Sequence, residues 1–234
     1  MPRPEPRPAA GKGRGIAIVT LALAVGAAAP VLAQSGALSP PAGQARCSFG
    51  AFVNETDPEG LNVRAGPGVG HKIVGRLPPV THSKSDPPIR AMVEIEVVAG
   101  SDGWFQIRKA RDNEALTEAA ARPMFKGSGW VSGRKLTVKS QADTGRERPD
   151  AKAPAIIAGR DGMAFDSDAF IPNGRLLGCS GKWVLVEYGP LPAGGDVLEA
   201  LEVNPPARAG LEPGRFRAWL DRICAVQETS CDGG

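Results

Sequence analysis

The chain has 234 residues, with 28 Lys and Arg against 25 Asp and Glu, and it holds 30 Gly and 22 Pro. The excess of positive charge lies in residues 1–33, and residues 34–234 are neutral overall, so the composition excludes a nucleic-acid surface built on net charge. The many turn-forming residues and the scarcity of long apolar helical stripes favour an all-β fold, and the length suits two modules of about 90 residues each.

Residues 1–33 have the pattern of a secretory signal. A basic segment that ends at Arg14 precedes an apolar run, Ile16 to Ala28, and small residues stand before a cleavage point after Ala33. The alternative is an uncleaved membrane anchor, but the run is shorter than the roughly 20 residues that a span needs. We therefore expect a periplasmic or secreted bacterial protein, exported by the general secretion route, with no membrane span once the signal is cleaved.

Residues 34–45 are rich in Ala, Gly, Pro and Ser, which predicts a disordered linker. The first module is expected over residues 46–139. Alternation of apolar and polar residues predicts its strands, and Asn113 is a candidate N-cap for a short helix. The predicted elements are, in chain order, Leu61–Arg64, Lys72–Leu77, Met92–Val98, Trp104–Arg108, the helix Glu114–Ala121 and the closing segment Gly129–Leu136.

A charged, proline-containing segment, residues 140–154, is expected to link the first module to a second, residues 155–234. The second module repeats the pattern of the first faintly. Its segments GKWVLVEYG, Gly181–Gly189, and RAWLDRIC, Arg217–Cys224, are similar to the two Gly-Trp strands of the first module.

The run GLNVRAGPG, Gly60–Gly68, is a short alternating strand that Gly-Pro-Gly terminates, because proline has no N–H and glycine adopts positive φ. This run resembles the signature LNVRSGPG of the bacterial SH3 (SH3b) domain. The segments GWFQIRKA, Gly103–Ala110, and GWVSGRKL, Gly129–Leu136, resemble the last strands of that family, although the insertion between them is longer than usual. The resemblance implies a small SH3-like β-barrel that binds a ligand and does not catalyse.

Two interpretations remain for residues 155–234: a divergent second SH3-like barrel in tandem with the first, or a cysteine-stapled extension that packs on it. The expected fold class is therefore all-β, with a small SH3-like barrel, two such barrels in the first interpretation, and disulfide staples.

The four cysteines are expected to form disulfides, because exported chains with an even cysteine count usually do. They are Cys47, Cys179, Cys224 and Cys231. Three pairings are possible. We favour Cys179 with Cys224 or Cys231, which would join the last strands of the second module and leave Cys47 to link the N-terminal to the C-terminal part.

The chain shows no pattern of catalytic residues. Cys179-Ser180-Gly181 is the context of the nucleophile in papain-like wall endopeptidases, but a thiol nucleophile needs a histidine partner, and the two histidines, His71 and His82, lie far upstream. The histidines have no cysteine cluster nearby, so no metal site is expected. Glu94 and Glu96 alternate on a strand and are expected on an exposed face. We predict that the protein is not an enzyme and uses no cofactor.

The resemblance suggests a ligand groove between the loop Asp57–Gly60 and the loop Pro78–Pro88, with Asn62, Arg64 and Trp104 at its edge. The alternative for Arg64 is that it only anchors a turn carbonyl. The tryptophans of such small barrels are more often core than ligand platforms.

The function that follows is non-catalytic binding in the bacterial envelope. The resemblance implies a peptidoglycan peptide or an envelope protein as partner, and the composition implies no nucleic acid. A structural or protein-interaction module of the periplasm, with no cell-wall ligand, is the alternative.

Overall fold

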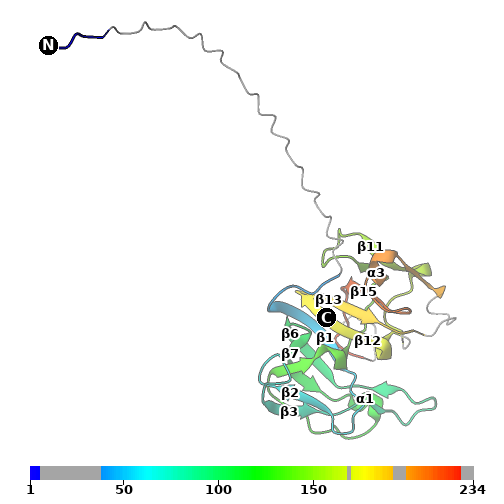
Figure 1. Cartoon of the computed structure of the whole chain (residues 1–234). Helices are drawn as coiled ribbons and strands as arrows, with labels where there is room; N and C mark the ends of the chain where they lie inside the picture. The colour runs from blue at the N-terminus through cyan, green and yellow to red at the C-terminus, as the bar shows by residue number, and fades with distance from the viewer. Residues whose placement is uncertain (6–37, 168–169, 192–198, 228–234) are drawn as a thin grey trace. The chain divides into compact units, whose positions relative to one another are not determined.

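The first sheet is built from strands that lie between Ala45 and Thr137. In the computed structural model, which describes residues 1–5, 38–167, 170–191 and 199–227 (Figure 1), this sheet has seven antiparallel strands in the order β3-β2-β8-β7-β6-β1-β9. Its strands are β1 (Ala45–Val53), β2 (Leu61–Arg64), β3 (Ile73–Leu77), β6 (Glu94–Ser101), β7 (Trp104–Arg111), β8 (Gly129–Ser132) and β9 (Leu136–Thr137).

Alternating side chains explain why these segments form strands. In β2, Leu61 and Val63 are buried, whereas Asn62 and Arg64 are half-buried on the opposite face. A small separate hairpin pairs β4 (Thr81–His82) with β5 (Arg90–Ala91). The predicted helix forms as α1 (Glu114–Thr117), with the Asn113 side chain accepting a hydrogen bond from Leu116 N at 2.9 Å.

The second sheet has six strands in the order β12-β13-β15-β10-β11-β14. They are β10 (Thr144–Arg146), β11 (Ala155–Gly159), β12 (Gly174–Ser180), β13 (Trp183–Tyr188), β14 (Leu201–Val203) and β15 (Phe216–Leu220). The helix α3 (Pro205–Arg208) and the short 3-10 helices η1 (Gly133–Lys135), η2 (Arg160–Gly162) and η3 (Ile171–Asn173) connect the strands. The chain is therefore mostly β, and its sheets include a half-barrel.

Both segments that were expected to be linkers contribute to the packing. Residues 140–154 contain β10, which pairs with β11 and β15 and so belongs to the second sheet. In the stretch 34–45, Leu38 is buried and Pro40 lies against Gly178 of β12.

The two sheets contain the same arrangement of three adjacent antiparallel strands in the same register. In the first sheet, the two-residue turn between β6 and β7 places Ser101 opposite Trp104. Gln106, two residues after Trp104, pairs with Trp130 of β8. In the second sheet, the turn between β12 and β13 places Ser180 opposite Trp183. Leu185, two residues after Trp183, pairs with Trp219 of β15. The faint sequence repeat is thus a repeat of strand pairing.

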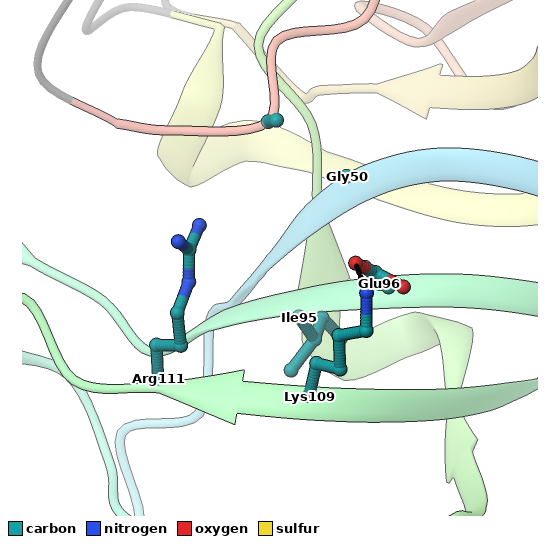
Figure 2. Close-up of a pocket in the computed structure, with 6 residues that line it drawn as sticks. Gly50, Ile95, Glu96, Lys109 and Arg111 are labelled. Carbon is teal, nitrogen blue, oxygen red and sulfur yellow. Dashed lines mark hydrogen bonds and ion pairs between the residues drawn. The ribbon is translucent and has the colours of Figure 1, made fainter. Parts of the chain in front are cut away.

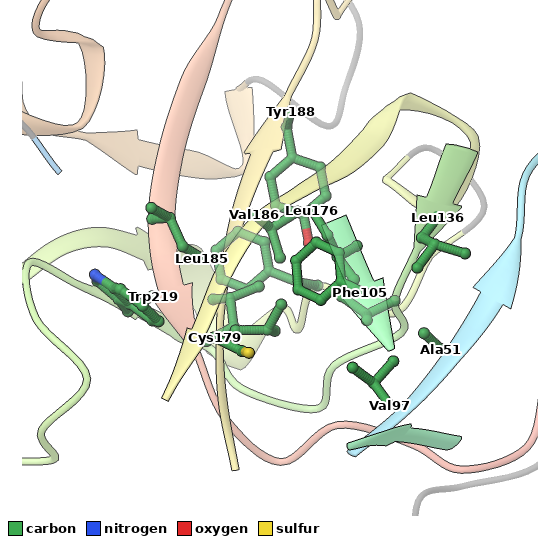
Figure 3. Close-up of a cluster of buried hydrophobic side chains, with 14 of the residues drawn as sticks. Ala51, Val97, Phe105, Leu136, Leu176, Cys179, Leu185, Val186, Tyr188 and Trp219 are labelled. Carbon is green, nitrogen blue, oxygen red and sulfur yellow. The ribbon is translucent and has the colours of Figure 1, made fainter. Parts of the chain in front are cut away.

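One hydrophobic core runs through both sheets. Figure 3 shows Phe105 and Leu136 of the first sheet beside Leu176, Val186 and Tyr188 of the second, and all five are buried. Phe165, Phe170 and Phe216 surround the Tyr188 ring at centroid distances of 5.4–5.8 Å. The two sheets therefore belong to one compact unit, which begins at Ser35.

The disulfide pairing that we favoured is wrong. Cys179 pairs with Cys47, with their Cα atoms 5.8 Å apart, so the bond joins β12 of the second sheet to β1 of the first. The reason is backbone pairing: Ser48 N donates to Gly181 O at 2.8 Å and Gly181 N donates to Arg46 O at 2.9 Å. Cys224 is disulfide-bonded as well. Cys231 lies outside the described residues.

Residues 6–37, which hold the apolar run and the cleavage point of the expected signal, also lie outside the described residues. No helix among the residues that the structure describes has the length and apolar character that a membrane span requires.

Candidate functional site

The largest cavity that we describe lies where the two sheets meet. It measures about 610 Å³, within the range of about 300–1,000 Å³ that is usual for ligand sites. Trp104 of β7, Arg175 of β12, Glu187 of β13 and Arg217 of β15 are among its lining residues, together with Arg134 of η1. We call this cavity the Trp104 cleft.

The position of Trp104 follows from a tight hairpin turn. Asp102 and Gly103 have φ values of 50° and 76°, the left-handed conformation that a two-residue hairpin requires. Trp104 is the first residue of β7 and lies opposite Ser132, which also lines the cleft. The indole is half-buried, whereas Trp130, Trp183 and Trp219 are buried, so three of the four tryptophans are core residues.

An exposed loop forms the apolar rim of the cleft. Val69, which is 77% exposed, lines the cleft from the turn that follows Gly66-Pro67-Gly68. Arg64 holds this turn, because its Nη1 donates to Val69 O and to His71 O, each at 2.8 Å. A side chain at Gly66 would also collide with the His71 ring, at 2.6 Å, so the turn packs tightly on itself.

A row of charged residues crosses the second sheet and forms the opposite wall. Arg175, Glu187 and Arg217 are direct cross-strand partners on β12, β13 and β15. The Glu187 carboxylate is buried, and its Oε1 accepts from Arg175 Nη2 at 2.6 Å. Arg215 Nη1 reaches the same oxygen at 3.4 Å and also donates to Gly189 O at 2.7 Å. Two arginines thus compensate the charge of Glu187.

The remaining cations of the cleft have few partners. Arg217 Nη2 donates to Ala209 O at 3.2 Å, and its Nε is buried with no hydrogen-bond acceptor, as is the Nε of Arg175. Within the described residues, the exposed Arg134 guanidinium has neither a hydrogen-bond acceptor nor an ion-pair partner. The cleft therefore carries an excess of positive charge beside the apolar surface of Trp104 and Val69.

Of the three residues predicted to bind ligand, Trp104 alone is among the residues that line this cleft. Arg64 anchors the turn carbonyls, as the alternative interpretation had it, and acts on the cleft only through Val69. Asn62 lies two residues before Arg64 on β2, and its Oδ1 accepts a hydrogen bond from Arg76 Nε at 3.1 Å.

Sequence reasoning missed the arginines of the second sheet. Part of their signal was alternation. Arg215 immediately precedes β15 and Arg217 is its second residue, so the two are expected on one face of the sheet. Nothing in that pattern indicates that this face meets Trp104, because the meeting depends on how the two sheets pack.

A smaller cavity of about 220 Å³ lies over β1, β6 and β7 (Figure 2), lined by Gly50, Ile95, Glu96, Lys109 and Arg111. The hydrogen bond from Lys109 Nζ, at 2.8 Å, and a second from Arg108 hold the pKa of Glu96 below its ordinary value. Because its charges are paired, Lys109 with Glu96 and Arg111 with Glu94, this cavity is a weaker candidate for a binding site than the Trp104 cleft.

Glu94 was expected on an exposed face, and that prediction is wrong. It is only 6% exposed, because the C-terminal segment lies across the sheet there. Gln227 N donates to Glu94 Oε1 at 2.9 Å, and Arg111 Nη2 donates to Glu94 Oε2 at 3.1 Å. A side chain at Gly50 would meet Ala225 Cα at 2.6 Å, so β1 admits this segment only because it carries glycine there.

The candidate residues for catalysis lie apart. Cys179 is in the disulfide, and His71 and His82 are both exposed. No cluster of three or more His, Cys, Asp or Glu side chains with metal-ligand geometry occurs among the described residues.

Comparisons of the chain with protein-family models, with curated proteins and with solved structures found no match. The SH3-like assignment of residues 46–139, and that of residues 155–234, therefore stay predictions that rest on the quoted motifs and strand order.

Proposed function

We propose that this protein is a non-catalytic binding protein of the bacterial cell envelope, and that it binds cell-wall peptide in the Trp104 cleft. The observation that carries the proposal is the composition of the cleft. In a cavity of about 610 Å³, a half-buried indole and an exposed valine line the same cleft as three arginines, of which Arg134 has no side-chain partner among the described residues and Arg217 has only a neutral one.

The peptide stems of the cell wall suit such a surface. They are short, rich in alanine methyl groups, and carry free carboxylates. An open cleft with an aromatic platform binds the apolar groups by burial, and guanidinium groups bind carboxylates with charge-assisted hydrogen bonds. The motif GLNVRAGPG supports the same function through its resemblance to the SH3b family.

Export to the envelope agrees with two further features. The N-terminal 33 residues have the pattern of a secretory signal. The Cys47–Cys179 bond joins the two sheets, and structural disulfides of this kind persist in oxidising compartments such as the periplasm.

The test is co-sedimentation of the oxidised protein with purified cell-wall sacculi. We expect saturable pelleting that Trp104→Ala abolishes and Trp104→Phe partly restores. Ile89→Ala is the matched control, because Ile89 is an exposed apolar residue, 46% exposed, that is not among the residues lining the cleft. Circular dichroism of each variant verifies the fold.

Absence of saturable pelleting by the wild type contradicts the cell-wall ligand. The alternative, an envelope protein as partner, is favoured by one observation: exposed apolar residues occur both on the loop that lines the cleft, at Val69, and on the edge strand β3 that follows it, at Ile73 and Val74. In that case, Val69→Ser weakens capture of the partner, and sacculi neither pellet the protein nor compete with the partner.

A further inference from the structure

Three arginines from separate elements point to the chemistry of the ligand. Arg134 comes from η1, directly after β8, Arg175 from β12 and Arg217 from β15, and all three line the Trp104 cleft. They meet because η1 packs directly on β12: a side chain at Gly133 would collide with Leu176 O and with the Phe105 ring.

The arginines differ in how far their charge is compensated. Arg175 shares the buried Glu187 carboxylate with Arg215. Arg217 has one hydrogen bond, from Nη2 to the neutral carbonyl of Ala209, and Arg134 has no side-chain partner within the described part of the chain. The uncompensated charge of the cleft therefore lies mainly on Arg134 and Arg217.

The buried Nε atoms of Arg175 and Arg217 add a second observation. A buried donor with no acceptor is costly, and such groups are rare in folded proteins. An anion held beside these guanidinium groups reduces that cost through its field, even where it does not contact Nε itself. A bound anion therefore lowers the electrostatic cost of holding these two guanidinium groups in the cleft, although it does not supply the missing acceptor for either Nε.

The other lining residues decide which anion fits. Charge alone does not choose among anions, because the cleft holds Glu187 and Asp102 as well as the arginines. Val69, Trp104 and Leu177 provide an apolar surface for a group attached to the anion. A C-terminal residue with a small apolar side chain suits both parts of the lining: its carboxylate suits the arginines, and its side chain suits the apolar residues.

We propose that the Trp104 cleft recognises a peptide by its free C-terminal carboxylate, with Arg134 and Arg217 as the carboxylate partners and the terminal side chain against Trp104 and Val69. This inference rests on the proposed function, since it names the group of the peptide that the cleft binds. Arg175 is a positioning residue, because its Nη2 is bound to Glu187.

The test compares two probes by isothermal titration calorimetry with the oxidised protein: N-acetyl-D-alanyl-D-alanine and the C-terminal amide of the same dipeptide. We expect the amide to bind at least about 10-fold more weakly, because it lacks the charge that the guanidinium groups bind. We also expect inorganic phosphate at equal concentration to displace the acid only weakly. Equal affinity for acid and amide, or tighter binding of phosphate than of the acid, overturns the inference.

Variants separate the arginines from the general charge of the protein. Arg134→Gln and Arg217→Gln are expected to weaken binding of the acid about five-fold or more each and to leave the weak binding of the amide unchanged. Arg160→Gln is the matched control, because Arg160 is exposed and is not among the lining residues. Arg217→Lys keeps the charge if Arg217→Gln proves unstable, and it should retain most of the preference for the acid.

The outcomes distinguish the two proposals. If sacculi pellet the protein but acid and amide bind equally, the carboxylate inference fails and the proposed function stands. If the acid binds better than the amide but sacculi do not pellet the protein, the cleft recognises carboxylate-terminated peptides of another source, and the cell-wall ligand fails. If the protein binds neither the sacculi nor either probe, both proposals fail.

Discussion

Arg64 Nη1 donates to the main-chain oxygen of Val69 at 2.8 Å, and Val69 in turn lines the Trp104 cleft, whereas Arg64 is not among the lining residues. The arginine of the GLNVRAGPG motif therefore serves the candidate site indirectly. It fixes the turn after β2, and the turn presents an exposed valine to the cleft. A motif residue that was predicted to bind ligand instead holds the turn that carries Val69.

Removal of this support should loosen the turn without unfolding the protein. Arg64→Ala removes both hydrogen bonds, so we expect faster amide hydrogen exchange over residues 65–72 and several-fold weaker binding to sacculi. Arg64→Lys should give an intermediate effect, because one ammonium lacks the fork geometry of a guanidinium. Arg76→Ala, on the next strand, is the control; an equal increase of exchange at residues 65–72 in that variant contradicts the specific role of Arg64.

The Cys47–Cys179 bond should contribute substantially to stability. It closes a loop with a sequence separation of 132 residues, and loss of a native disulfide in a domain of this kind costs about 2–5 kcal/mol of unfolding free energy. We expect the double variant Cys47→Ala/Cys179→Ala to lose stability in that range in urea titrations. Mass spectrometry of the non-reduced, protease-digested wild type should find the peptides of Cys47 and Cys179 linked; a Cys179 peptide linked to Cys224 or Cys231 contradicts the pairing.

Gly133 should be intolerant of any side chain. A Cβ there would meet Leu176 O of the other sheet, and Gly103 O at 2.9 Å, so Gly133→Ala must separate η1 from β12. Overpacking of this kind costs about 1–3 kcal/mol. Gly70→Ala is the matched control: its φ is not in the left-handed region and a Cβ there meets nothing within 4 Å, so thermal denaturation should change little. Equal melting temperatures for both variants would show that the sheets tolerate the extra methyl group.

Acid should destabilise the insertion between β7 and β8 through Asp112. The Asp112 carboxylate is buried and accepts from Arg122 Nη2 at 2.6 Å and Nε at 2.9 Å, and the Arg122 hydrogen bonds hold the pKa of Asp112 below its ordinary value. Arg122 Nη1 also donates to Pro79 O at 2.6 Å, so the pair ties the insertion to the loop after β3.

Because the folded-state pKa of Asp112 is depressed, its contribution is present above the unfolded-state pKa, about 3.9, and is lost as the pH falls through the lower folded-state value. We expect Asp112→Asn to lose about 1–3 kcal/mol of unfolding free energy at pH 7 and to show a smaller further loss on acidification than the wild type. Urea titrations between pH 7 and pH 2 measure both. Parallel pH curves for wild type and variant exclude Asp112 as the responsible group.

Local patterns were sufficient for some of the elements, although they did not predict β1, β10, β11 or β14. The alternation Leu61-Asn62-Val63-Arg64 predicts β2 with the bounds that it has, and Asn113 caps a helix as expected, although α1 ends at Thr117 because Glu118 adopts a left-handed conformation with φ 48°. These features depend on side chains a few residues apart, which is the range over which period, turn chemistry and capping act.

The faint sequence repeat also had a physical basis. The hairpin turns before Trp104 and Trp183 fix a Ser–Trp pair in each half, and turn length sets hairpin register. The register of the third strand, with Trp130 in one half and Trp219 in the other, is the same despite loops of different length. A loop can change its length without changing the pairing of the strands that it connects.

By itself, the sequence determined the all-β class, the positions of part of the strands and turns, and a mostly buried set of tryptophans. Only the tertiary structure decided that Cys179 meets Cys47, that Glu94 is buried under Gln227, and that Arg134, Arg175 and Arg217 line one cleft with Trp104. The physical reason is distance along the chain: periodicity and turn chemistry act between near neighbours, whereas these contacts join segments that only the packing of two sheets around one core brings together.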